Sequence, residues 1–155
     1  MTRHTTTAPS TSPAPLLDAR LIGLAHYAGR GILEAVLARH GIAFQEQITL
    51  RPVALAEGPV ERDALVRQIV GALKVTEAEV GATVDALIGR GLLAAEGACV
   101  RLTDDGRALH ETATAEVRPI SERIYAGLPA EDLAVAGRLL TLITERADAE
   151  LAALR

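Results

Sequence analysis

The chain has 155 residues, of which 49% are hydrophobic, and a formal net charge of -4 at pH 7. This length and apolar content suffice for one sizeable core, so we expect one domain, with or without a dimerisation extension. Aromatic residues make up only 2%, so Leu, Ile, Val and Ala must form the core, which favours packed helices. The net charge excludes a general attraction to polyphosphate, and nucleic-acid binding would depend on the placement of individual arginines.

Cysteine content and the start of the chain limit the other classes. Cys99 is the single cysteine, which excludes an internal disulfide and a cysteine-rich metal site. Residues 1–15 are rich in Thr, Ser, Pro and Ala and have no apolar run of signal-peptide length, so we expect a disordered arm. Charged residues interrupt the later apolar stretches from Asp18 onward, so we expect no membrane association and a cytoplasmic location.

The first third of the chain predicts helices. Residues 16–40 carry apolar side chains at spacings of three and four, which indicates one long amphipathic helix. A second helix is expected from about Ala43, bending or ending near Pro52, whose nitrogen carries no hydrogen. A third helix follows Gly58 and Pro59, with apolar positions at Leu65, Ile69, Val70 and Leu73.

A capping box marks the next helix. Thr76 followed by Glu79 predicts that the Thr hydroxyl accepts the Glu79 amide while the Glu carboxylate accepts the Thr76 amide. Gly91 ends this fourth helix. Strand-like LLAAE, a turn near Gly97 and strand-like CVRLT then predict a hairpin of two short strands.

Two further helices complete the chain. Thr103 is expected to cap a fifth helix that Pro119 kinks, and Pro129 to begin the last one. The last helix carries a near-heptad apolar stripe, which is typical of a helix that packs against a partner. The stripe comprises Leu133, Ala136, Leu140, Ile143, Ala147, Leu151 and Leu154. We therefore expect the first and last helices to dock two copies into a homodimer.

Three segments, VDALIGRGLL, VRLTDDGRAL and GLPAEDLAVAGRLL, occur in this order of helices and hairpin. On them the chain resembles the MarR family of winged-helix transcriptional regulators. The resemblance implies a mostly α winged helix-turn-helix with a short two-stranded β wing, in a single domain over residues 16–155. Residues 43–108 would form the DNA-binding lobe, and residues 16–40 with 109–155 the dimerisation helices. It also implies a homodimer that binds palindromic duplex DNA and releases it when a small-molecule effector enters a pocket between the two lobes.

The resemblance also places candidate DNA contacts. The start of the recognition helix, aimed at base edges in the major groove, would be Thr76, Glu77, Ala78, Glu79, Gly81 and Ala82. Candidates for phosphate contacts are Arg62, Arg67, Lys74, Arg90, Arg101 and Arg107. Against these six bases the segment from Val60 to Arg107 has eight acids, namely Glu61, Asp63, Glu77, Glu79, Asp85, Glu96, Asp104 and Asp105. Ala95 to Ala98 also leave almost no wing tip, although family wings usually carry a longer, basic one.

Several of these residues have a structural interpretation as well. The capping role alone accounts for Glu79. Arg90 either contacts phosphate or is a solvated cation at a helix C-terminus. Arg101 either contacts DNA or pairs with Asp104 or Asp105, and Cys99 is either an inert strand residue or an oxidisable thiol.

The first helix contains the candidate ligand residues. Gly29 and Gly31 together cost about 2 kcal/mol relative to alanine, which suggests a bend or a close approach by another helix or a ligand. His26, Tyr27 and Arg30 offer polar groups to an aromatic or anionic ligand, and His110 could face the same crevice. The alternatives are glycine-mediated helix packing and a surface histidine. The histidines form no metal-ligand pair, and no cofactor or catalytic motif occurs.

The sequence thus predicts a ligand-responsive transcriptional repressor, not an enzyme, that binds duplex DNA as a homodimer. A ligand near His26, Tyr27 and Arg30 would shift the spacing of the two recognition helices away from one DNA turn, about 34 to 36 Å. The acidic recognition helix and short wing keep two alternatives open. One is a relative that has lost operator binding and serves as a small-molecule-binding protein or an enzyme, and the other is an antagonist that pairs with a functional regulator.

Overall fold

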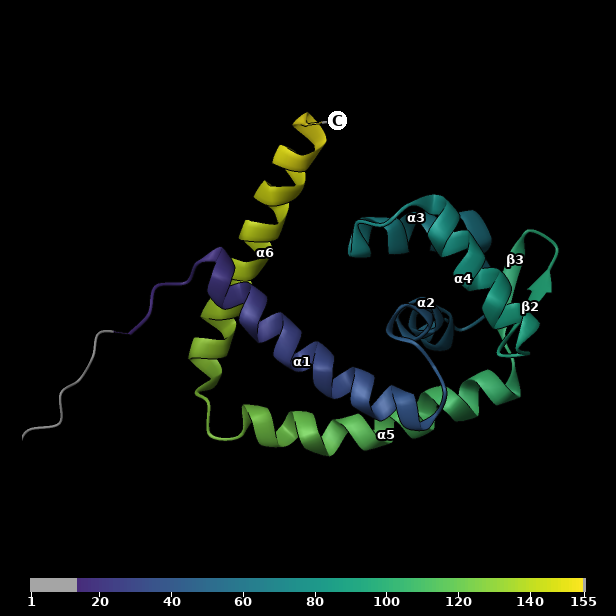
Figure 1. Cartoon of the computed structure of the whole chain (residues 1–155), viewed down its shortest axis with the longest axis horizontal. Helices are drawn as coiled ribbons and strands as arrows, with labels where there is room; N and C mark the ends of the chain where they lie inside the picture. The colour runs from purple at the N-terminus through teal and green to yellow at the C-terminus, as the bar shows by residue number, and fades with distance from the viewer. Residues whose placement is uncertain (1–13, 155) are drawn as a thin grey trace, which may run out of the picture.

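A computed structural model describes residues 14–154, which form six helices and a small sheet (Figure 1). In chain order the elements are α1 (Ala19–Arg39), α2 (Phe44–Leu55), β1 (Val60–Glu61), α3 (Arg62–Leu73), α4 (Glu77–Gly89), β2 (Leu93–Glu96), β3 (Cys99–Leu102), α5 (Asp104–Tyr125) and α6 (Ala130–Ala153). The mostly α winged fold class is thereby confirmed. The arm expected over residues 1–15 falls, except for its last two residues, outside the described part of the chain.

Local signals set most helix ends as predicted. The Thr76 hydroxyl accepts the Glu79 amide at 3.3 Å, and the Glu79 carboxylate accepts the Thr76 amide at 2.8 Å, so the capping box is present. Thr103 caps α5 by accepting the Gly106 amide at 3.0 Å. Gly91, with φ of 71°, follows α4 in the left-handed conformation that favours glycine. Helix α2 continues through Pro52 for one more turn and ends at Leu55.

The sheet differs from the prediction by one strand. The hairpin β2–β3 is present, but β1 pairs antiparallel with β3, giving the order β1-β3-β2. The predicted two-stranded wing is therefore confirmed as β2–β3, and β1 is a third strand that the sequence did not predict. Strand β1 spans two residues directly after Pro59, too few to produce an alternating pattern that sequence can reveal. It anchors the start of α3 beside the hairpin, where the Arg62 amide donates to the Ala98 carbonyl at 3.0 Å.

The hydrophobic core lies in the winged part of the molecule. It joins the end of α1 to α2, α3, α4 and the hairpin through fully buried side chains such as Leu37, Leu50, Leu65, Leu87 and Leu93. Helix α5 enters this core at Gly106, where an added Cβ would overlap the backbone carbonyl oxygen of Leu92. Backbone contact at this point fixes the start of α5 against the link between α4 and β2.

The terminal helices are far less buried. Helix α5 runs beneath α1 from the sheet towards α6, and α6 crosses α1 near its start (Figure 1). None of the 24 residues of α6 is buried, although it carries the predicted apolar stripe. By length and hydropathy alone α1 could cross a membrane, but its C-terminal half contributes Val36 and Leu37 to the protein interior.

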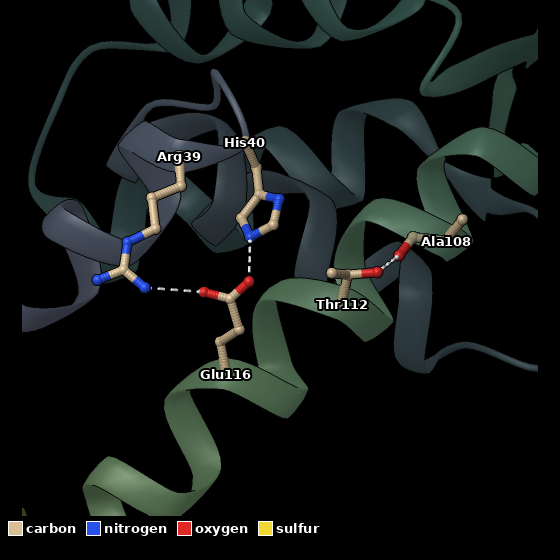
Figure 2. A network of polar contacts seen from close by, with 5 residues as sticks. All are labelled: Arg39, His40, Ala108, Thr112 and Glu116. Carbon is tan, nitrogen blue, oxygen red and sulfur yellow. Dashed lines mark hydrogen bonds and ion pairs between the residues drawn. The ribbon is translucent and has the colours of Figure 1, made fainter.

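A polar network ties α1 to α5 (Figure 2). Glu116 on α5 accepts from His40 Nε2 at 2.9 Å and from Arg39 at 3.3 Å, both at the end of α1. One turn earlier, the Thr112 hydroxyl donates to the Ala108 carbonyl within α5. The end of α1 and the middle of α5 are therefore held together by charge as well as by packing.

Candidate functional site

The exposed start of α4 is acidic or small. Glu77, Ala78 and Ala82 are exposed, Gly81 is half-buried, and the helix contains no lysine or arginine. The Glu79 carboxylate is held by the backbone amide and then the hydroxyl of Thr76, and these hydrogen bonds lower the pKa of Glu79. This face therefore offers hydrogen-bond acceptors to a partner and no charged donor of its own.

Of the six basic residues that we named as candidate phosphate contacts, five have a carboxylate partner within the described part of the chain. The pairs are Arg62 with Asp85 at 2.9 Å, Arg67 with Glu61 at 3.6 Å, Lys74 with Asp148 at 2.6 Å, Arg90 with Glu46 at 2.8 Å and Arg101 with Glu96 at 3.5 Å. In the described residues Arg107, the sixth base of this region, has no such pair. The basic residues are present, but carboxylates within the chain already neutralise most of them.

Arg90 joins two parts of the fold. Its guanidinium donates to both oxygens of Glu46, at 2.9 and 2.8 Å, and to the Gly41 carbonyl at 2.9 Å. It thereby links the end of α4 to the turn between α1 and α2. Neither sequence interpretation of Arg90 anticipated this bidentate contact, because its partner is 44 residues away in the chain.

The wing has one exposed base. Arg101 pairs with Glu96 on the neighbouring strand and not with Asp104 or Asp105, the partners named in one of the two interpretations. Both side chains of this pair are more than half exposed, and contacts of this kind contribute little to stability. Cys99 starts β3 opposite Glu96 and Glu61 and is half-buried.

A cavity of about 680 Å³ lies between α2 and α5, and Leu33 of α1 also lines it. Its walls are mainly apolar, and polar groups enter from both helices: Gln47, Arg51, His110, Arg118, Ser121 and Glu122. This volume is typical of small-molecule sites. Burial, with a further contribution from Arg51, lowers the pKa of His110, which favours the neutral ring.

Gln47 is the most constrained polar group of this cavity. Its side chain is 6% exposed, its Nε2 lies 3.3 Å from His110 Nδ1, and its Oε1 has no hydrogen-bond partner. A buried acceptor without a donor costs about 1 to 3 kcal/mol. The cavity wall therefore holds a buried acceptor that a protonated His110 could satisfy once the amide of Gln47 rotates.

The four ligand residues predicted from sequence do not meet within one subunit. His110 lines the α2–α5 cavity, whereas His26 and Tyr27 line a shallower hollow of about 550 Å³ with Ile143 of α6. Arg30 stacks on the Phe44 ring at 4.4 Å and pairs with Glu34 at 2.8 Å. In the described part of the chain no atom beyond the adjacent residues and the nearby backbone of α1 lies within 4 Å of a Cβ built on Gly29 or Gly31, so the expected close approach is not made within the subunit.

The chain resembles known proteins in its structure but matches none in the sequence comparisons. No family model matches the sequence, and no characterised protein matches it. Solved structures do match. CouR from Rhodococcus jostii RHA1, bound to p-coumaroyl-CoA, has a TM-score of 0.67 and 20% identity over 80% of this chain and 88% of CouR. The MarR family protein Rv2887 of Mycobacterium tuberculosis, in complex with DNA, has a TM-score of 0.61 and 25% identity over 84% of this chain and 98% of Rv2887.

Rv2887 in complex with salicylic acid also matches, with 27% identity, a TM-score of 0.57 and the same coverage of 84% and 98%. The chain has the winged-helix fold of the MarR family. In this fold the resemblance assigns α3 and α4 to the helix-turn-helix and β2–β3 to the wing. The acidic face of α4 and the paired bases therefore belong to the surface that the MarR resemblance assigns to DNA.

Sequence reasoning missed Gln47 and Arg51 as candidate site residues of this MarR fold. Gln47 and Thr49 are buried polar residues among the apolar positions Ile48, Leu50 and Val53, and that interruption was the available signal. Arg51 follows one helical turn after Gln47 and lines the same cavity. The cavity itself depends on the packing of α2 against α5, which no local pattern shows.

Proposed function

We propose that the protein is a ligand-responsive transcriptional repressor, located in the cytoplasm, that binds palindromic duplex DNA as a homodimer. The observation that carries the proposal is the α2–α5 cavity beside the winged part of a MarR fold. Rv2887 was solved with DNA and with salicylic acid, and CouR with p-coumaroyl-CoA, which supports both a DNA partner and a small-molecule effector.

The dimer is inferred from unpartnered apolar surface. Helix α6 exposes Leu139, Leu140, Leu142 and Ile143 by 40 to 46% each. Helix α1 exposes Leu24 by 55%, and its glycines leave room for another backbone. We propose that residues 16–40 and 109–155 dimerise while residues 43–108 bind DNA.

On the DNA side we propose that Thr76, Glu77, Gly81 and Ala82 face base edges. Arg62, Arg67, Lys74, Arg90 and Arg101 would lie closest to the phosphates. Glutamate can accept from the amino group of cytosine, but it repels phosphates. Phosphate binding would therefore require these basic side chains to exchange their carboxylate partners for DNA phosphates.

The effector site we propose is the α2–α5 cavity, with His110 as a ligand residue. His26, Tyr27 and Arg30 would contact an effector only if it extended along α1 or reached the partner subunit. Helix α5 supplies the coupling, because its start packs on Leu92 of the winged part and its middle forms the cavity wall. A ligand that separates α2 from α5 would move α4 relative to its counterpart in the dimer.

A second candidate function follows from the ion pairs. A relative that has lost operator binding would keep the cavity and neutralise its former DNA face, as the five carboxylate partners do here. It would serve as a small-molecule-binding protein.

Fluorescence anisotropy with labelled DNA that flanks the protein's own gene tests the two candidates, read at several salt concentrations. The repressor predicts binding in dilute buffer, weakened by Arg101→Ala and unchanged by Arg138→Ala, which removes an exposed arginine of α6. Sedimentation should show a dimer. Failure of the unaltered dimer to bind any fragment in dilute buffer would reject the repressor and favour the second candidate.

A further inference from the structure

The side chains of His110 and Gln47 could form a second hydrogen-bonding arrangement, which differs from the one in the structure. As the atoms lie, Gln47 Nε2 donates to His110 Nδ1, which requires the neutral ring with its hydrogen on Nε2. The buried Gln47 Oε1 then has no donor. If the ring gained a proton at Nδ1, rotation of the amide by half a turn would place Oε1 where Nε2 now lies, and the new N–H would donate to it.

The charges around His110 decide when that second state is favourable. Arg51, from α2 across the cavity, opposes a positive ring, whereas Glu111, the next residue on α5, favours it. Arg118 and Glu122 line the cavity further along α5, and α1 contributes only the apolar Leu33. Without a ligand, burial and Arg51 prevail and lower the pKa of His110. An anion beside Arg51 would cancel that repulsion and add an attraction of its own.

On the basis of the proposed effector site, we propose that an anionic ligand binds in the α2–α5 cavity together with one proton, which His110 takes up from solvent at Nδ1. The protons balance: the neutral ring, one proton from solvent and a ligand carboxylate become an imidazolium and a carboxylate within one site, with Gln47 Oε1 accepting from the new N–H. Ligand affinity then depends on pH through a single residue. An uncharged ligand of the same shape gives no such dependence.

Proton linkage determines whether ligand affinity rises or falls with pH. Ligand binding raises the pKa of His110 from its lowered value in the free protein, so the complex holds more protons than the free protein between the two pKa values. Affinity for an anion is therefore highest at low pH and falls as pH rises through the pKa of the complex. One linked proton gives at most about a tenfold change in affinity per pH unit.

The test uses 2-naphthoate as the probe, because it is an apolar aromatic carboxylate that stays ionised between pH 6 and 8, with 2-naphthamide as its uncharged counterpart. Isothermal titration calorimetry of the full chain in buffers of different ionisation enthalpy gives the number of protons bound. Labelled-histidine NMR gives the titration of His110, assigned by the loss of its signal in His110→Gln.

We expect naphthoate binding to take up a fraction of a proton that approaches one, to weaken with rising pH, and to raise the pKa of His110. Naphthamide should bind without proton uptake. His110→Gln should bind naphthoate with little pH dependence, whereas Arg138→Ala, altered on the exposed face of α6 outside the cavity, should behave as the unaltered protein does. NMR spectra of each variant without ligand report whether it is folded.

An unchanged His110 titration at saturating naphthoate, pH-independent binding, or no binding of naphthoate would each overturn the proposal. A parallel DNA titration separates this failure from that of the proposed function. DNA binding without proton-linked naphthoate binding rejects only the role of His110. Loss of both rejects the repressor as well.

Discussion

Replacing Glu96 by glutamine tests whether the wing meets DNA. Glu96 lies 3.5 Å from Arg101, and both side chains are more than half exposed. An exposed pair of this kind contributes about 0.2 to 1 kcal/mol, so the fold should be unaffected. The substitution removes a negative charge from the surface that we propose binds DNA and frees Arg101 for a phosphate. We therefore expect Glu96→Gln to bind duplex DNA more tightly than the unaltered protein.

The size of the gain follows from counterion release. In the unaltered protein a phosphate must replace Glu96 at Arg101, and the displaced carboxylate remains nearby. In the variant each subunit gains one unopposed phosphate contact, or two per dimer. At a slope of 0.9 per contact, the logarithmic salt dependence should steepen by about 1.8. If the two proteins bind DNA equally at 1 M salt, Glu96→Gln should bind about 60-fold more tightly than the unaltered protein at 0.1 M salt.

Fluorescence anisotropy at four or more salt concentrations measures both quantities. Glu131→Gln, at the exposed start of α6, makes the same charge change away from the wing and should alter neither. Adding Arg101→Ala to Glu96→Gln should abolish the gain. Equal slopes and affinities for Glu96→Gln and the unaltered protein would show that the wing does not contact phosphate, and the reasoning would be refuted.

Three further substitutions test the scaffold, each read by denaturant unfolding. Gly106→Ala should lower the free energy of unfolding by about 1 to 3 kcal/mol, because its Cβ would overlap the Leu92 carbonyl oxygen. Gly137→Ala in α6, where an added Cβ meets no atom within 4 Å, is the control, and a Gly106→Ala variant as stable as the unaltered protein would contradict the close approach. Arg90→Ala should lower the free energy of unfolding by about 1 to 2 kcal/mol through loss of the contacts to Glu46 and Gly41, and an unchanged free energy of unfolding would show that these contacts do not stabilise the fold. Because folding lowers the pKa of His110, the unfolded chain binds a proton at this residue more readily, and the stability that comes from the neutral ring is present above about pH 6.5 and lost below it. From pH 7 to 5, His110→Gln should therefore lose less free energy of unfolding than the unaltered protein. Identical losses in the two proteins would contradict the burial of His110.

The elements that sequence predicted well are those set by neighbouring residues. The capping box of Thr76 and Glu79, the cap at Thr103 and the stop at Gly91 each need contacts within a few residues. The same locality explains what was missed. Strand β1 exists because Val60 pairs with Val100, and nothing near Val60 announces that partner.

The candidate site depends still more on distant contacts. Arg90 could not be assigned from sequence because Glu46 is 44 residues away, and Lys74 meets Asp148 only because the end of α6 approaches α3. His110 was named from its position on α5, but its partner Gln47 lies 63 residues earlier. Charge counting anticipated three of the five carboxylate partners, because Glu61, Asp85 and Glu96 belong to the acidic excess of the segment from Val60 to Arg107. The other two partners, Glu46 and Asp148, lie outside that segment.

The ion pairs of the basic residues and the release of DNA when an effector binds can be parts of one mechanism. Exchanging an exposed carboxylate for a phosphate releases few additional counterions, so a face built of such pairs binds DNA less tightly and with a weaker salt dependence than free arginines would. Typical coupling between a ligand site and a second site is about 1 to 3 kcal/mol. A regulator whose DNA affinity is already modest needs no more than this to leave its operator when the α2–α5 cavity is filled. The carboxylates around α4 would then set the affinity within the range that one small ligand can control.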